Sequence, residues 1–227
     1  MGRRSEGPHR SANLRARGMK AVVFDAMGVL YRDGNVQGRV LIPYLRAQGC
    51  SAPEERIRAA YRAATLGSLS TDGFWSAVGL AARDEHYCRE HVLTEGTREA
   101  LDELAGDGLA LACLSNDTAA WSAILRRRFG LDRRIRRWFI SSDLGARKPD
   151  PAPYEAVLGA LGLPAAEVLF VDDRPANLAP ARSLGMRTVL FRSDDSGPDP
   201  GPGVGTMPEL VAAVRAMTAG ENRSSTP

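Results

Sequence analysis

The chain has 227 residues, of which 44% are apolar and 25% charged, and its formal net charge is +3. This length accommodates one α/β domain with an insertion, and the composition is ordinary for a soluble globular protein. No apolar run is long enough to cross a bilayer, which argues against a membrane partner.

From Met19 onward, short apolar strands alternate with helical stretches. Strands are predicted at residues 20–25, 109–114, 137–141, 167–172 and 187–191. Helices are predicted between them at residues 97–106, 118–129, 151–161 and 175–184. This alternation is typical of an α/β fold, a doubly wound parallel sheet covered by helices on both faces. We expect residues 19–32 and 96–192 to form this core.

The other segments lack this alternation. Residues 1–18 are basic and poor in large apolar side chains, so we expect a disordered tail. Residues 33–95 show helical periodicity only and are expected to form an all-helical insertion. Residues 193–227 begin with a stretch rich in Asp, Gly, Pro and Ser, which indicates a linker, then a short helix at 207–218 and a flexible tail.

Local signals mark several helix ends. Asp117 or Thr118 is a candidate N-cap, Pro175 a first-turn proline and Gly185 a C-terminal glycine. Ser51-Ala-Pro-Glu54 has the spacing of a capping box.

Cysteine spacing and charge exclude some functions. The three cysteines lie far apart and lack the spacing of metal-binding pairs, and reduced cysteines fit a cytoplasmic protein. Seven arginines crowd residues 126–137, but no nucleic-acid-binding signature accompanies them. Because arginines near a helix C-terminus interact favourably with its dipole, a solvated helix is favoured over a nucleic-acid partner. The sequence carries no signal for the oligomeric state.

Polar residues stand where predicted strands end. The first strand ends at Asp25, the second at Ser115, and the strand at 167–172 leads into the pair Asp172-Asp173. Lys148 directly precedes the helix start at 149–151. Ligands of open α/β sheets bind at the carboxyl ends of the strands, so we expect these residues to form one site.

In this order, the segments resemble the four motifs of the haloacid dehalogenase superfamily, most of whose members are Mg²⁺-dependent phosphatases. They are Lys20–Tyr31, Ala110–Asp117, Arg147–Pro151 and Val168–Pro175. The resemblance covers about residues 19–192. It implies a Rossmann-like core, a small phosphorylated substrate, and a helical cap at 33–95 that closes over the site and excludes water.

The resemblance also implies a role for each motif residue. Asp25 would be the nucleophile, forming an aspartyl-phosphate and so splitting one difficult step into two. Ser115 and Asn116 would bind the phosphoryl oxygens. Lys148 would act in catalysis and phosphate binding by neutralising charge on the nucleophile and on the phosphoryl group.

The adjacent carboxylates of Asp172 and Asp173 repel each other, and a bound cation relieves that repulsion. The resemblance implies Mg²⁺ held by Asp25, Asp173 and the backbone carbonyl of Met27. Asp172 and Asn177 would support these ligands through hydrogen bonds.

Met27 departs from the pattern. Phosphatases of this family usually carry a second aspartate at this position, two residues after the nucleophile, which protonates the leaving group and then activates water. Methionine does neither. Loss of such a group typically costs about 10²–10⁴-fold in rate.

Four interpretations follow. The favoured one is a slow or specialised Mg²⁺-dependent phosphatase. The second is a metal-independent 2-haloacid dehalogenase, whose branch Phe24–Leu30 resembles, although the pair Asp172-Asp173 argues against it. The third is a non-catalytic phosphate- or metabolite-binding protein, and the fourth is a basic, nucleic-acid-associated protein with an inherited fold.

Overall fold

A six-stranded parallel sheet with the order β3-β2-β1-β4-β5-β6 forms the centre of the molecule. The computed structural model describes residues 18–193 and 196–223. The strands are β1 (Ala21–Phe24), β2 (Ala110–Ser115), β3 (Arg137–Ile140), β4 (Val168–Asp172), β5 (Arg187–Phe191) and β6 (Gly203–Val204). Every neighbouring pair runs parallel, so all carboxyl ends meet at one edge.

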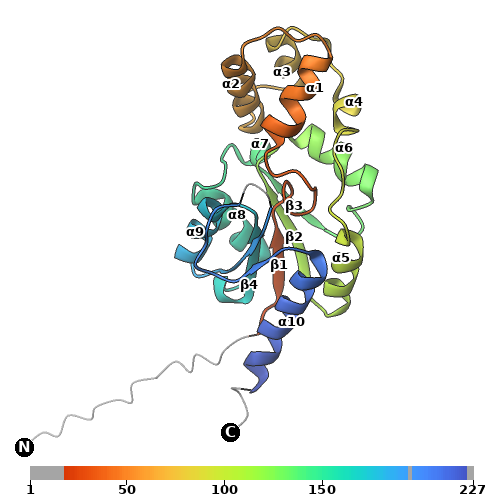
Figure 1. The fold of residues 1–227 in the computed structure, drawn as a ribbon. Coiled ribbons are helices and arrows are strands. Elements are labelled where there is room, and N and C mark those ends of the chain that lie inside the picture. The colour runs from red at the N-terminus through yellow and green to blue at the C-terminus, as the bar shows by residue number, and fades with distance from the viewer. Residues whose placement is uncertain (1–17, 194–195, 224–227) are drawn as a thin grey trace, which may run out of the picture.

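Helices cover both faces of this sheet, which confirms the predicted doubly wound fold (Figure 1). They are α5 (Thr97–Gly106), α6 (Ala119–Phe129), α7 (Ser141–Leu144), α8 (Ala152–Leu161), α9 (Pro175–Ser183) and α10 (Met207–Arg223). Alternate side chains of β1 point to opposite faces. Ala21 and Val23 pack with α8 and α9, whereas Val22 and Phe24 pack with α5, α6 and α10.

The predicted helix caps have mixed outcomes. The Thr118 hydroxyl accepts a hydrogen bond from the backbone N–H of Trp121, and Pro175 and Gly185 bound α9 as expected. The prediction of a capping box at residues 51–54 is wrong. α2 begins after Pro53 with no side-chain cap, because that proline fixes an extended entry and leaves Ser51 outside the first turn.

The C-terminal region also differs from expectation. β6 lies inside the stretch predicted to be a linker, where its two residues pair with the end of β5. A strand of two residues is too short to show a periodic pattern in the sequence. α10 extends five residues past the predicted end at 218, to Arg223. The basic segment 1–17 lies outside the described residues. Among the helices that are described, none has the length and apolarity needed to cross a membrane.

Four helices lie together at one end of the molecule, beyond the carboxyl edge of the sheet (Figure 1). They are α1 (Ile42–Ala47), α2 (Glu54–Thr65), α3 (Thr71–Ala77) and α4 (Asp84–Cys88), and a short π-helix, Gln37–Leu41, leads into them. All four lie within residues 33–95. We call them the cap helices.

Aromatic rings join the cap helices to the core. Trp121 of α6 packs edge-on against Phe74, Trp75 and Tyr87. Asp84 Oδ1 accepts hydrogen bonds from the indole N–H groups of Trp75, at 2.5 Å, and Trp121, at 2.7 Å. A single carboxylate therefore fixes one side of the cap helices against α6.

A second contact lies where α2 ends. The Ser141 hydroxyl donates to the Thr65 carbonyl at 2.5 Å. A Cβ on Gly67, whose φ is +77°, would stand 2.2 Å from the Ser142 carbonyl oxygen. Glycine is therefore required there both by the backbone conformation and by the close approach of the core.

Gly67→Ala should lower the free energy of unfolding by about 1 kcal/mol or more beyond the roughly 1–2 kcal/mol that a left-handed conformation costs an L-residue. Gly79→Ala is the matched control, because Gly79 has the same φ of +77° with nothing within 4 Å of its Cβ position. Urea denaturation of both variants measures the difference. Equal losses would mean that the approach of Ser142 costs nothing.

Candidate active site

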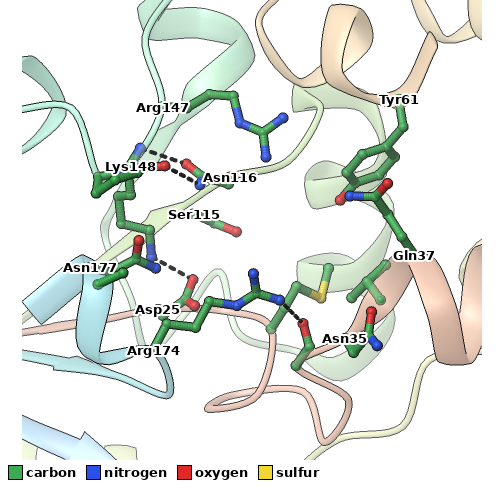
Figure 2. Close-up of a pocket in the computed structure, with 15 residues that line it drawn as sticks. Asp25, Asn35, Gln37, Tyr61, Ser115, Asn116, Arg147, Lys148, Arg174 and Asn177 are labelled. Carbon is green, nitrogen blue, oxygen red and sulfur yellow. Dashed lines mark hydrogen bonds and ion pairs between the residues drawn. The ribbon is translucent and has the colours of Figure 1, made fainter. Parts of the chain in front are cut away.

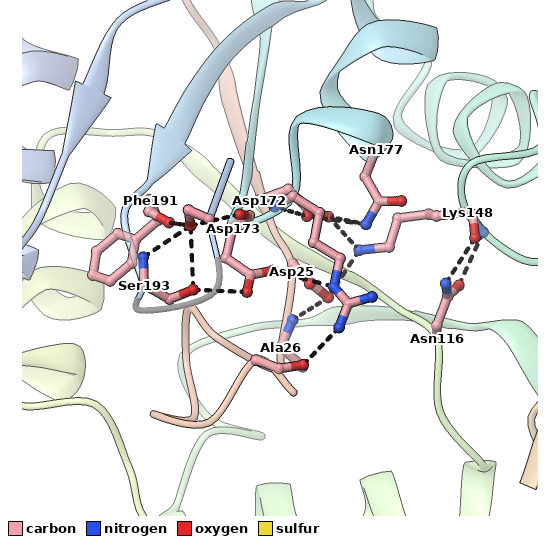
Figure 3. A network of polar contacts seen from close by, with 12 residues as sticks. Asp25, Ala26, Asn116, Lys148, Asp172, Asp173, Asn177, Phe191 and Ser193 are labelled. Carbon is pink, nitrogen blue, oxygen red and sulfur yellow. Dashed lines mark hydrogen bonds and ion pairs between the residues drawn. The ribbon is translucent and has the colours of Figure 1, made fainter. Parts of the chain in front are cut away.

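The carboxyl ends of β1, β2 and β4 bring the predicted site residues together (Figure 3). Asp25 follows β1, Ser115 ends β2, and Asp172 ends β4 with Asp173 directly after it. Lys148 reaches them from the loop between α7 and α8. All five side chains are buried.

Lys148 bridges two carboxylates. Its Nζ lies 2.8 Å from Asp25 Oδ1 and 2.7 Å from Asp172 Oδ2. Burial alone would lower the pKa of Lys148, but attraction to Asp172 and Asp25 outweighs it and the pKa is raised. The ammonium group is therefore a fixed positive charge beside Asp25.

The two adjacent aspartates have different surroundings. Both oxygens of Asp172 accept hydrogen bonds from Asn177 Nδ2 at 3.0 Å, and its Oδ1 also accepts from the backbone N–H of Arg174. By contrast, Asp173 Oδ1 is buried and has no hydrogen-bond partner among the described residues. Its Oδ2 accepts only a 3.2 Å hydrogen bond from Ser193. Asp173 Oδ1 therefore remains available to a ligand, whereas both oxygens of Asp172 already accept hydrogen bonds from the protein.

Asp25, Asp172 and Asp173 each offer an oxygen, and these atoms lie within 4.8 Å of one another. Burial raises the pKa of Asp25 to about 8, although Lys148 opposes the shift, and burial with repulsion from Asp172 raises the pKa of Asp173 to about 6. Three buried carboxylates face one buried lysine and the more exposed Arg174, whose Nε lies 4.0 Å from Asp173 Oδ1. A cluster of three carboxylates offers the oxygen ligands that a hard divalent cation prefers.

The loop after β1 packs directly on Asp173. A Cβ on Gly28 would lie 2.3 Å from Asp173 Oδ2, and a Cβ on Gly34 would lie 2.0 Å from the same atom. Arg174 Nη2 donates to the Gly34 carbonyl at 2.9 Å. Gly34 was not predicted as a site residue, because a lone glycine in a polar segment carries no signal of what approaches it.

A cavity of about 240 Å³ opens over these residues (Figure 2). Asp25, Lys148 and Asn177 stand on one side of it, and Tyr61 and Gln37 on the other. The lining residues also include Met27, Gly34, Asn35, Val36, Ser115, Asn116, Arg147, Pro149, Arg174 and Ala176. The cavity is therefore walled by core and cap residues together.

Two predicted phosphate-binding residues differ in their contacts. Ser115 Oγ is buried, lines the cavity and has no partner within the part of the chain that is described. The Asn116 side chain is engaged, because its Nδ2 donates to the Lys148 carbonyl at 2.8 Å and its Oδ1 accepts from the Lys148 N–H at 2.9 Å. Asn116 thus holds the backbone of Lys148 in place, and its contact with phosphate stays a prediction.

Residues 19–185 match the haloacid dehalogenase-like hydrolase family, and the chain belongs to it. Flavin mononucleotide hydrolase 1 of Arabidopsis thaliana is 34% identical over 102 residues, which cover 45% of this chain and 41% of that protein. Phosphoglycolate phosphatase 1 of Pseudomonas aeruginosa is 32% identical over 141 residues, 59% of this chain and 52% of that protein. The chain spans about half the length of these curated relatives.

Solved structures share the fold at lower identity. A family enzyme of Bacteroides thetaiotaomicron in complex with magnesium and inorganic phosphate superposes with a TM-score of 0.67 at 20% identity, covering 79% of this chain and 97% of that one. The L-2-haloacid dehalogenase of Xanthobacter autotrophicus gives 0.62 at 22%, covering 88% and 99%. The fold alone therefore does not choose between the two reactions.

The raised pKa of Asp25 predicts a pH effect on the cation-free protein. Between 3.8 and about 8, folded Asp25 holds a proton that the unfolded chain releases. The free energy of unfolding should therefore fall as pH rises through this range. Urea denaturation in EDTA between pH 6 and 8 measures this decline. Burial also raises the pKa of Asp117 to about 7, so the contribution of Asp25 is taken from the difference between the wild type and an Asp25 variant.

Asp25→Asn should flatten this decline, since the amide does not titrate. Asp143→Asn, which removes an exposed carboxylate from α7, is the control and should keep the wild-type slope. Identical slopes in wild type and Asp25→Asn would contradict the assigned pKa.

Proposed function

We propose that this protein is a Mg²⁺-dependent phosphatase that hydrolyses a small phosphorylated metabolite through an aspartyl-phosphate on Asp25. The observation that carries the proposal is the cluster of three buried carboxylates with a single lysine. Buried charges of one sign require a counter-charge, and a divalent cation supplies it. A dehalogenase, which uses a carboxylate nucleophile without metal, has no need of the third carboxylate.

The metal ligands in this proposal are Asp25, Asp173 and the backbone carbonyl of Met27. The free oxygen of Asp173 supports its assignment over the saturated Asp172. When bound, Mg²⁺ supplies positive charge that offsets the negative charge of the phosphoryl group. Asp172 and Asn177 take the supporting role, since together they hold Lys148 in place.

The chain's own residues carry the reaction in two steps. A carboxylate oxygen of Asp25 attacks phosphorus in line, the bond to the leaving oxygen breaks, and water then hydrolyses the aspartyl-phosphate. Lys148 stands 2.8 Å from the nucleophile and stabilises charge on the transferring group. Ser115 Oγ lines the cavity and has no hydrogen-bond partner among the described residues, which supports a role as donor to a phosphoryl oxygen.

Relatives named as phosphatases or hydrolases of phosphate esters support this reaction class. A non-catalytic phosphate-binding protein is the second candidate, and Met27 is the observation that favours it. The methionine side chain is 9% exposed and lines the cavity where the family's second aspartate usually stands.

Turnover of an activated aryl phosphate with and without Mg²⁺ tests the proposal. The wild type should release the phenol only with Mg²⁺, Asp25→Asn should lose turnover by at least about 10²-fold, and short 2-haloacids should release no halide. Asp173→Asn should lose the rise in melting temperature that Mg²⁺ gives the wild type, since a native-state ligand stabilises. Halide release without metal would replace this proposal with the dehalogenase reaction, and Mg²⁺-dependent phosphate binding without turnover would favour the binding protein.

Met27→Asp should restore the missing acid. Turnover of an alkyl phosphate should rise by about tenfold or more in kcat/KM, because a poor leaving group needs a proton. Turnover of an aryl phosphate should change less. Burial would raise the pKa of the new carboxyl group, which suits a proton donor. A parallel fall for both substrates in a folded variant would show that methionine is itself part of the working site.

A further inference from the structure

Positive charge dominates the cavity. Three cationic side chains line it, those of Arg147, Lys148 and Arg174, against the single carboxylate of Asp25. A cavity of this charge attracts anions. The question is which of the three cations remains available to a substrate group other than the reacting phosphoryl group.

Two of the three cations already have charged partners. Lys148 is shared between Asp25 and Asp172. Arg174 donates to the Gly34 carbonyl, and its Nε lies 4.0 Å from Asp173 Oδ1. Both arrangements hold the catalytic carboxylates and the adjoining loop.

Arg147 has no such charged partner. Its guanidinium group contacts the neutral hydroxyl of Thr65 on α2, and it forms no ion pair within the described residues. Burial lowers the pKa of Arg147; Tyr61 and Asp117 oppose this shift, whereas Arg62 and Arg174 add to it. A half-buried guanidinium group without an ion pair favours binding an anion.

The position of Arg147 sets the distance at which an anion would bind. Its backbone directly precedes that of Lys148, which Asn116 fixes through two hydrogen bonds. Its side chain extends into the space between the core and Tyr61 (Figure 2). The backbone next to Arg147 is therefore held by the core, while its guanidinium group lies beside Thr65 of α2, where a substrate group other than the phosphoryl group would lie.

We propose that the substrate is a short phosphorylated carboxylic acid and that Arg147 binds its carboxylate. This rests on the proposed phosphatase function and names the substrate class of the same site. The cavity of about 240 Å³ is smaller than the roughly 300–1,000 Å³ typical of ligand pockets. It therefore suits a compact molecule, and the planar guanidinium fork matches a carboxylate with two parallel hydrogen bonds.

Phosphonates test this by binding alone, so the missing acid at Met27 does not interfere. Phosphonoacetate carries a carboxylate, ethylphosphonate replaces it with a methyl group, and ethane-1,2-bisphosphonate offers a second phosphonate instead. Calorimetric titration of the full chain with Mg²⁺ should give phosphonoacetate at least about tenfold tighter binding than ethylphosphonate, the effect of a charge-assisted hydrogen bond.

Arg147→Gln should reduce this preference to less than about twofold while ethylphosphonate affinity stays within about twofold of wild type. Arg62→Gln removes an exposed arginine near the cavity that does not line it, and should keep the preference. Thr65→Val removes the hydroxyl that Arg147 contacts but leaves the guanidinium group, so it should also keep the preference. Loss of the preference in Thr65→Val equal to that in Arg147→Gln would assign the effect to docking of the cap helices.

Three other results would overturn the proposal. A preference that survives in Arg147→Gln means that another group binds the carboxylate. Equal loss of both phosphonates means that Arg147 binds the phosphoryl group. An Arg147-dependent gain for the bisphosphonate alone means that the second anion is a phosphate. Failure of the phosphatase function is seen separately, as absent aryl phosphate turnover by a wild type that still distinguishes the phosphonates.

Discussion

The buried bridge from Lys148 to Asp25 and Asp172 is the interaction on which the site depends. A lysine without partners is costly to bury, and so is each carboxylate, but at 2.7–2.8 Å the three groups compensate one another. This fixes the end of β4, the end of β1 and the loop before α8 in one arrangement. Next to this bridge, Asp173 Oδ1 accepts no hydrogen bond from any described residue, which is why the cluster suits a cation.

Residues next to each other in the sequence differ in whether they take part in this bridge. Asp172 and Asp173 are adjacent carboxylates, yet one is saturated by protein donors and the other is not. Lys148 and Arg147 are adjacent cations, yet Lys148 is held by two carboxylates, whereas Arg147 contacts the Thr65 hydroxyl and forms no ion pair in the described part of the chain. In each pair the two side chains are similar, and the hydrogen bonds and ion pairs that each makes within the protein decide which of them can bind a ligand.

Helix α2 and the π-helix before α1 complete the cavity without supplying its carboxylates or Lys148. Tyr61 and Gln37 form the wall opposite Asp25, while the carboxylates and Lys148 come from the core. Hydrogen bonds of Asp84 and Ser141 hold the cap helices to the core at two places.

The sequence by itself determined the sheet and the strand-end residues, because buried parallel strands are apolar runs and their polar termini are visible in one dimension. It placed Asp25, Ser115, Lys148 and the aspartate pair at one edge. Only the tertiary structure decided which aspartate has both oxygens hydrogen-bonded, that Asn116 binds the Lys148 backbone, and that Arg147 has no ion-pair partner among the residues the structure describes. β6 and the approach of Gly34 to Asp173 were likewise decided by packing. These are contacts between residues distant in sequence, and no local pattern encodes them.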